Sequence, residues 1–356
     1  MNAFFSIEKT KKRKIIRLLG IKISIKRKNV SEKTEQKTLP KVVQKTIIAK
    51  KRDFSPVYSP DNIVLNYIYD NYFTNRDRRW FIEQKFIRLL GYFPDFDNPQ
   101  TFNEKIHWMN LYHHNPLIPK CKDKYNLKKY ITEKLGSEYV VPLIGVWERV
   151  NEIDFDSLPN QFVIKVNWSD GEKCNFIVKD KSKADIDYIK SQLADRIQPW
   201  HNAYYKNFAW GSKDIPPKII AEEYIEQLDG KLNDYKLYCY NGKHKHTLVC
   251  KDRSIKTKYI NMDKDWNCFM PSKNSTYEAQ CEKPKLYDRM VEIAEELSKP
   301  FPLCRVDFYE VDDRIYIGEM TFNPNCGFNH YYKEWDVKLG NLIDLSTIPP
   351  EYLVMS

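Results

Sequence analysis

The segment Cys304-Arg-Val-Asp-Phe-Tyr-Glu-Val-Asp-Asp-Arg-Ile-Tyr-Ile-Gly-Glu319 decides the fold, because its two alternating halves predict a β-hairpin that turns at residues 311–313. Side chains alternate between the faces of a strand, so Arg305 and Asp307 share one face. Glu319 ends the second strand, and carboxylates on paired strands can meet at one point. Oxygen ligands of this kind suit Mg²⁺ shared with phosphate oxygens, although carboxylates that face solvent are the alternative.

Two other predicted strands each carry a lysine. Phe162-Val-Ile-Lys-Val166 is apolar except for Lys165, which needs an anionic partner if it is buried and could otherwise reach the sheet edge. The loop Asn167-Trp-Ser-Asp-Gly171 follows, and its N–H groups could cradle phosphate, although it is not a Walker loop. Asp234-Tyr-Lys-Leu-Tyr-Cys-Tyr240 carries Lys236, which is suited to the charge that develops on a transferred γ-phosphate.

A further strand is predicted at Lys218-Ile-Ile-Ala-Glu-Glu-Tyr-Ile225, which ends in acidic and aromatic residues. Backbone groups at such an edge could bind adenine, although any strand end could look similar. After Asp234–Tyr240, the pair Asn241-Gly242 leads into another strand at 245–249, which is a strong hairpin signal.

Helical patterns separate these strands. Between Pro60 and Leu111 the pattern is helical, and Thr101 begins a helix with Glu104 at capping-box distance. Further helices are expected at about 122–135, 184–197 and 286–297, and short strands at 140–143 and 175–178. Because no regular βαβ series is present, these patterns predict an α+β fold with mixed or antiparallel sheets.

Charge is unevenly distributed along the chain. Residues 1–52 contain 17 Lys and Arg against 3 acidic residues, a balance of +14, so the remaining residues carry −4 of the formal net charge of +10. The folded part is therefore slightly acidic, and we expect no nucleic-acid partner. Residues 1–28 alternate basic with bulky apolar side chains, which could bind an anionic membrane surface or form a solvated tail.

The eight cysteines show no C-x-x-C spacing, and several lie in strand-like runs. Free, buried thiols in a reducing cytoplasm are the simplest interpretation. No apolar stretch reaches the roughly 18 residues that a membrane-spanning helix needs. We therefore expect a cytoplasmic protein, which residues 1–28 could hold at the inner face of the plasma membrane.

The order of these elements along the chain resembles the ATP-grasp fold, in which a nucleotide lies between two α+β lobes. More closely, the chain resembles the TupA-like ATP-grasp family, named for teichuronopeptide synthesis, over roughly residues 95–345. The resembling segments are Phe102-Asn-Glu-Lys-Ile-His-Trp108, Asp123-Lys-Tyr125, Leu158-Pro159, Phe162-Val-Ile-Lys-Val-Asn167, Glu222-Glu-Tyr-Ile225, Asp234-Tyr-Lys236, Asn241-Gly-Lys243, Arg305-Val-Asp307 and Gly318-Glu-Met-Thr-Phe322.

The charge distribution, the helical pattern and the resemblance together predict an organisation into parts. These are a basic arm and linker over 1–52, a helical N-terminal region over 53–120, a first lobe over 121–225, a second lobe with the metal-binding hairpin over 226–346, and a tail over 347–356.

ATP is the first cofactor that the resemblance implies. The residues assigned to it are Lys128, Lys165, Ser169, Gly171, Glu222, Tyr224, Ile225 and Asp229. Among them, the two lysines would touch phosphate, the strand end at 222–225 would line the adenine pocket, and Asp229 would reach the ribose.

Mg²⁺ is the second implied cofactor. The implied metal ligands are Asp307, Glu319 and Asn323, and the implied catalytic residues are Lys236, Arg253 and Arg305. Lys236 would face the γ-phosphate or the acceptor, and the two arginines would stabilise the transferring phosphoryl group.

The chain departs from the family's pattern at two places. After Asn167 the family usually has His-Gly-Ser-Gly, whereas this chain has Trp168-Ser-Asp-Gly171. An aspartate near phosphate is unfavourable unless it points away or binds metal. Members of the fold usually place an asparagine two residues after the metal-binding glutamate, whereas Thr321 stands there and Asn323 lies two residues further on.

The resemblance leaves three functions open. The first is a ligase of bacterial capsule, O-antigen or other surface-polysaccharide synthesis, which joins a carboxylate to an amine through an acyl phosphate. The second is a sugar kinase or glycosyltransferase with the same fold, and the third is a non-enzymatic adaptor at the membrane surface. The acceptor, a small molecule or a glycan, would meet the irregular loops Pro199–Trp210 and Asn325–Trp335, and the oligomeric state is left open.

Overall fold

The structure is a computed structural model that describes residues 73–168, 175–225, 233–251, 257–268, 270 and 281–354 in full. In the N-terminal segment it describes only the backbone of residues 5–9, 13–18 and 21–26. The chain falls into two compact units, Met1–Arg52 and Asp53–Ser356.

The first unit contains a three-stranded antiparallel sheet in the order β1-β2-β3. Its strands are β1 (Phe5–Lys9), β2 (Arg13–Leu18) and β3 (Ile21–Lys26). The expectation for residues 1–28, a membrane-binding segment or a solvated tail, includes no strand. The strict alternation of isoleucine with polar residues through β3 nevertheless has the period of two that is typical of a strand.

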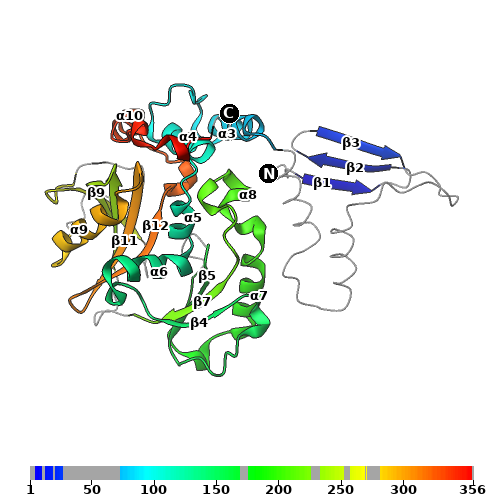
Figure 1. Ribbon diagram of the computed structural model, residues 1–356. Helices are drawn as coiled ribbons and strands as arrows, with labels where there is room; N and C mark the ends of the chain where they lie inside the picture. Colours follow the sequence, from blue (N-terminus) through cyan, green and yellow to red (C-terminus); the bar gives the residue numbers. More distant parts are fainter. Residues whose placement is uncertain are drawn as a thin grey trace. The chain divides into compact units, whose positions relative to one another are not determined.

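A four-stranded antiparallel sheet in the order β4-β7-β5-β6 forms the first lobe of the second unit. Its strands are β4 (Leu143–Trp147), β5 (Phe162–Val166), β6 (Asn175–Val178) and β7 (Ile219–Glu223). Helix α7 (Ile186–Arg196) packs its apolar side on β5 (Figure 1). The strand expected at 140–143 begins only at its last residue, Leu143, although the carbonyl of Pro142 already accepts a hydrogen bond from the backbone N–H of Glu223 at 3.0 Å.

The second lobe is a five-stranded antiparallel sheet in the order β10-β9-β8-β11-β12. Its strands are β8 (Asp234–Tyr240), β9 (Lys243–Lys251), β10 (Lys258–Asp263), β11 (Leu303–Val311) and β12 (Arg314–Thr321). Helix α9 (Tyr287–Ser298) covers one face of this sheet (Figure 1). Both expected hairpins are present, and positive φ angles at Asn241 (48°) and Gly242 (74°) provide the tight turn between β8 and β9.

Helices α5 (Leu117–Lys122) and α6 (Lys124–Leu135) lie against β12. Asp123 separates them, and its side chain caps α6 by accepting a hydrogen bond from the backbone N–H of Tyr125 at 2.9 Å. The same carboxylate accepts a hydrogen bond from Asn167 at the end of β5 at 2.8 Å. The start of α6 is therefore tied to the first lobe.

Four further helices and several 3₁₀ turns belong to the described part of the second unit. They are α3 (Asn75–Leu90), α4 (Phe102–Tyr112), α8 (Ala203–Asn207) and α10 (Lys333–Gly340), with short 3₁₀ turns at Ser137–Tyr139, Val150–Glu152, Lys181–Lys183, Pro199–His201, Trp210–Ser212, Pro324–Gly327, Leu345–Thr347 and Pro350–Tyr352. The predicted capping box of α4 is present, with reciprocal bonds between Thr101 and Glu104. Helix α4 packs on α10, so the helical region is joined to the C-terminal segment.

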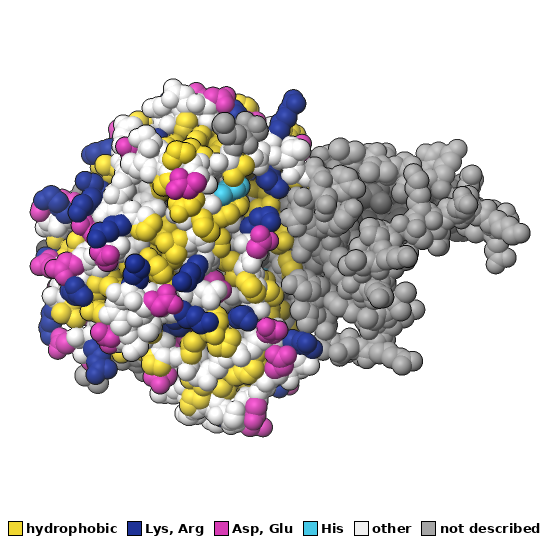
Figure 2. Space-filling model, viewed as in Figure 1, with side chains coloured by type: hydrophobic (Ala, Val, Ile, Leu, Met, Phe, Trp, Pro, Cys, Tyr) yellow, Lys and Arg dark blue, Asp and Glu magenta, His cyan; other side chains and the backbone are white. Residues whose placement is uncertain are grey.

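Basic and acidic side chains are interspersed on the face shown in Figure 2.

Among the described residues, all cysteines are free, and Cys121, Cys239, Cys250 and Cys304 are buried as expected, whereas Cys268 is exposed. Within the same part of the chain, none of the helices has both the length and the apolar character to cross a membrane.

Candidate functional site

A cavity of about 430 Å³ lies between the two sheets of the second unit. Side chains of β5 and β7 line it on one side, those of β8 to β12 line the other, and α5 and α6 contribute residues at one end. Its volume falls in the range of about 300–1,000 Å³ that is typical of small-molecule sites. Among the described residues that line it are six cations and four carboxylates, so the cavity favours an anionic ligand.

On the first-lobe side, two lysines share one carboxylate. Glu222 on β7 is buried, and its two oxygens lie 2.9 Å from Lys128 Nζ and 2.5 Å from Lys165 Nζ. Lys128 also donates to the carbonyl of Val141 at 2.7 Å. The alternation of β5 places Lys165 on the cavity side of the sheet, while Phe162, Ile164 and Val166 pack into the core. Two ammonium groups are thus held within reach of one point.

On the second-lobe side, the hairpin that decides the fold supplies two carboxylates. The register of β11 and β12 places Asp307 opposite Glu319. Arg305 bridges them, donating to Asp307 at 2.6 and 2.7 Å and to Glu319 at 2.9 Å. Lys236 on β8 pairs with Asp307, and Lys124 at the start of α6 lies 3.2 Å from Glu319. The two carboxylates that were expected to meet on paired strands, Asp307 and Glu319, therefore lie opposite each other, with Arg305 between them.

The charges of these groups are fixed by their neighbours. Burial alone would raise the pKa of Glu222, but the ammonium groups of Lys165 and Lys128 lower it to about 2. Burial would likewise raise the pKa of Glu319, and the surrounding cations hold it well below its usual range. Burial lowers the pKa of Lys236, yet its partner Asp307 leaves the net shift upward. All three groups are therefore charged at neutral pH.

The carboxylates of the hairpin suit a divalent cation. Hard cations such as Mg²⁺ prefer charged oxygen ligands, and Glu319 is ionised while Asp307 faces it across the two strands. Each carboxylate oxygen has two lone pairs, so Asp307 Oδ1, which accepts one N–H bond from Arg305, and Glu319 Oε2, which contacts Lys124, each retain acceptor capacity. Asp307 and Glu319 are thus the residues that fit Mg²⁺.

Several other predicted site residues either do not lie where a ligand in the cavity would reach them as predicted, or fall outside the described residues. Asn323 lines the cavity, but its side-chain oxygen accepts a hydrogen bond from Lys122 at 2.8 Å. Tyr224 and Ile225 follow the end of β7, and neither lines the cavity. The predicted residues that lie outside the described part of the chain are Ser169, Gly171, Asp229 and Arg253.

Trp168, which departs from the family's pattern, is part of the core of the first lobe. Its ring is buried in the core of the first lobe, and its Nε1 donates to the carbonyl of Arg196 at the end of α7 at 3.2 Å. The tryptophan therefore anchors the entry of the loop that follows β5.

Two lysines of the cavity, Lys122 and Lys124, were not predicted. They flank Asp123, which separates α5 from α6, and both point to residues of the C-terminal hairpin or just beyond it. The segment Asp123-Lys-Tyr125, one of the points of resemblance to the family, carries the available signal for Lys124.

The comparisons with known proteins agree with this geometry. The model of the TupA-like ATP-grasp family matches residues 104–344. Because the match spans more than half of the chain, this protein belongs to the TupA-like ATP-grasp family. The predicted family and the predicted α+β ATP-grasp fold, with a helical region before the two lobes, are therefore confirmed. No curated protein matches the chain.

Solved structures with partial similarity to this chain include a ligase and a synthetase. The D-alanine–D-alanine ligase from Helicobacter pylori is 13% identical, with a TM-score of 0.41, and the match covers 64% of this chain and 61% of that one. The D-cycloserine synthetase DcsG is 16% identical, with a TM-score of 0.37 and coverage of 64% and 70%. The chain thus spans about three fifths of the first of these proteins.

Proposed function

We propose that this protein is an Mg-ATP-dependent ligase that joins a carboxylate to an amine through an acyl phosphate. One observation carries the proposal: a single cavity has a two-lysine cluster on one wall and a paired-carboxylate cluster on the other. The first cluster suits phosphate oxygens and the second suits the divalent cation that accompanies them. Membership of the ATP-grasp family supports the same assignment.

In this proposal Lys128 and Lys165 bind nucleotide phosphate. Both ammonium groups now contact Glu222, and each retains donors for another partner because an ammonium group has three. Glu222 holds the two charges together and offsets their mutual repulsion. The nucleotide therefore meets cations that are already positioned, which reduces the cost of ordering them on binding.

Lys236 and Arg305, on the opposite wall of the cavity, would face the γ-phosphoryl group. Their charges would stabilise the oxygens of the γ-phosphoryl group as its bond to the β-phosphate breaks. When bound, Mg²⁺ would neutralise part of the phosphate charge, with Asp307 and Glu319 as its protein ligands.

The proposed reaction needs no protein nucleophile. A carboxylate oxygen of the acceptor attacks the γ-phosphorus, the bond to the bridging oxygen breaks, and its electron pair leaves with ADP. An amine then attacks the acyl carbon, phosphate leaves, and the nitrogen loses a proton to give the amide. The protein contributes positioning and charge neutralisation.

We further propose that the acceptor belongs to bacterial surface-polysaccharide synthesis and that residues 1–28 bring the protein to an anionic membrane. The family's name supports the first point, and the surplus of Lys and Arg before residue 53 supports the second. Sedimentation with phosphatidylserine vesicles should exceed sedimentation with phosphatidylcholine vesicles and should fall as salt increases. Equal sedimentation with both vesicle types would exclude an electrostatic membrane contact.

The direct test of the ligase assignment uses the full chain with Mg-ATP, uronic acids and a panel of amines. We expect ADP to be released only when an acid is present, and the product mass to equal that of acid plus amine minus water. A stable gain of one phosphate would instead identify a sugar kinase. If no acid releases ADP, the ligase proposal is wrong.

A further inference from the structure

Lys122 differs from the other cations that line the cavity. Among the described residues of this cavity, the other five each contact a carboxylate: Lys124 with Glu319, Lys128 and Lys165 with Glu222, Lys236 with Asp307, and Arg305 with Asp307 and Glu319. Lys122 instead donates to the neutral amide oxygen of Asn323 at 2.8 Å. Its charge is therefore not matched by a carboxylate within the described part of the cavity.

The position of Lys122 in the fold is tightly defined. It ends α5, where Asp123 turns the chain into α6. Gly211 allows the adjacent 3₁₀ turn to approach α5, since a Cβ there would lie 2.5 Å from Ile118 Cγ2 and 3.8 Å from Lys122 Cδ. The aliphatic stem of the lysine is thus held beside Gly211, while its ammonium group reaches the cavity.

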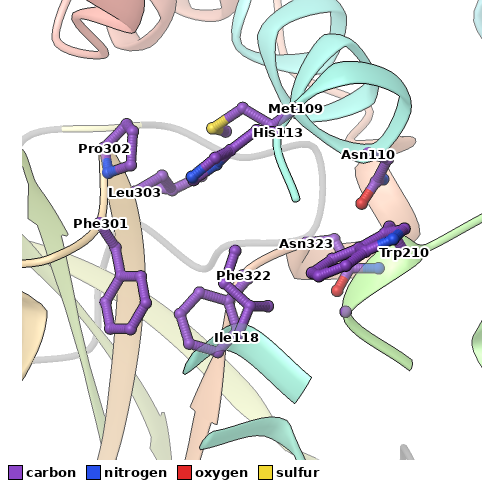
Figure 3. A pocket seen from close by; sticks show the side chains of 11 residues that line it. Met109, Asn110, His113, Ile118, Trp210, Phe301, Pro302, Leu303, Phe322 and Asn323 are labelled. Carbon is purple, nitrogen blue, oxygen red and sulfur yellow. The ribbon is translucent and has the colours of Figure 1, made fainter. Parts of the chain in front are cut away.

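Asn323 is equally well placed. It lies two residues after Thr321, whose hydroxyl donates to Glu319 at 2.9 Å. On another side Asn323 borders a smaller cavity of about 20 Å³, which it shares with Trp210 and His113 (Figure 3). Since the oxygen of its amide accepts from Lys122, its Nδ2 is the donor that remains for a ligand.

The loop that follows Asn323 is rigidly connected to the helical region. Asn325 and Cys326 line the large cavity and adopt left-handed backbone angles, with φ of 50° and 55°. The buried side chain of Asn103 on α4 accepts from the backbone N–H of Asn329 at 2.8 Å and donates to its carbonyl at 2.9 Å. Left-handed conformations cost energy in residues other than glycine and are often found at active sites and ligand-binding sites.

We propose that Lys122 and Asn323 bind the reactive carboxylate of the acceptor. This inference rests on the proposed ligase function. A single ammonium group and one amide N–H suit the single charge and two oxygens of a carboxylate. Asn323 follows Glu319 by four residues, and Lys122 lies two residues before Lys124, which contacts Glu319 at the end of the cavity where the γ-phosphate would be attacked.

The location also explains why a lysine is useful there. A carboxylate and a γ-phosphate repel each other, and a nearby ammonium group reduces this repulsion during their approach. The attacking oxygen forms a bond to phosphorus while ADP leaves with the electron pair of the broken bond. No proton has to move in this step, so Lys122 acts through its charge.

The test uses the full chain saturated with Mg²⁺ and a non-hydrolysable ATP analogue. D-glucuronate and its neutral match D-glucuronamide are titrated by calorimetry. In the wild-type protein we expect glucuronate to bind at least about tenfold more tightly than the amide, because a charge-assisted hydrogen bond is lost in the amide. In Lys122→Gln this preference should disappear, and Lys122→Arg should restore part of it.

Affinity for the ATP analogue separates this inference from the ligase proposal. We expect Lys122→Gln to bind the analogue as tightly as the wild type, whereas Lys165→Gln should bind it weakly. If glucuronate binds no better than glucuronamide, or if Lys122→Gln loses nucleotide affinity as Lys165→Gln does, the acceptor site is assigned wrongly. If the wild type does not bind the analogue, the failure lies in the proposed function itself.

Discussion

Glu222 shows how individual charges are set within the cavity. Its carboxylate contacts both Lys128 and Lys165, and their ammonium groups lower its pKa from the usual 4.5 to about 2 despite its burial. Because the unfolded chain then binds more protons than the folded chain between these values, the stabilisation by Glu222 is fully present above pH 4.5. It is lost as the pH falls towards 2.

Replacing this carboxylate should therefore change the pH dependence of stability. We expect Glu222→Gln to lower the free energy of unfolding by about 3 kcal/mol at pH 7, with a difference that shrinks steadily below pH 4.5. Urea unfolding followed from pH 7 to pH 3 measures this difference, with the exposed Glu223→Gln as control. A difference that stays constant over the whole range would show that the two lysines do not lower the pKa of Glu222.

Asp307 carries a comparable role in the second lobe. It is buried and contacts both Arg305 and Lys236, so its removal leaves two cations without their main partner. Breaking a buried pair of this kind typically costs about 3–5 kcal/mol. We expect Asp307→Asn to lower the free energy of unfolding, measured with a chemical denaturant, by a large part of that amount. Asp312→Asn in the exposed turn should change it by less than about 0.5 kcal/mol. Equal stability of the two variants would contradict the proposed charge cluster.

At the scale of elements, α4 and α10 hold the loop after Asn323, which borders the cavity. Asn103 donates to Asp336 at 2.9 Å and makes three further hydrogen bonds with Asn329, all in buried surroundings. Asn103→Ala leaves several of these groups unpaired, and we expect it to lower the free energy of unfolding, measured with a chemical denaturant, by about 2–4 kcal/mol. The exposed Asn98→Ala is the matched control. A loss no greater than that of the control would mean that the network does not fix this loop.

The same elements show what the sequence can and cannot predict. Lys165 and the hairpin carboxylates could be predicted, because strand alternation is a local pattern and determines which side chains share a face. Lys122 could not, since its partner Asn323 is 201 positions away and only the packing of α5 brings them together. The start of β4 was also misplaced, because strand ends depend on pairing partners rather than on local preference.

For the molecule as a whole, the two lobes meet around the cavity and both supply charged side chains that line it. A ligand that contacts both walls should stabilise the folded protein in proportion to its affinity and concentration. We expect Mg-ATP to raise the melting temperature by several degrees, and ATP with excess chelator to raise it less. An equal rise with and without Mg²⁺ would argue against a metal role for Asp307 and Glu319.

The central claim is that the cavity binds Mg-ATP through Lys165 and its neighbours. Titration calorimetry with a non-hydrolysable Mg-ATP analogue tests this claim most directly in three proteins: the wild type, Lys165→Gln, and Lys183→Gln at an exposed position. We predict one site per chain, a loss of at least about tenfold in affinity for Lys165→Gln, and no change for Lys183→Gln. Equal affinity in all three proteins, or no binding to the wild type, would contradict the account.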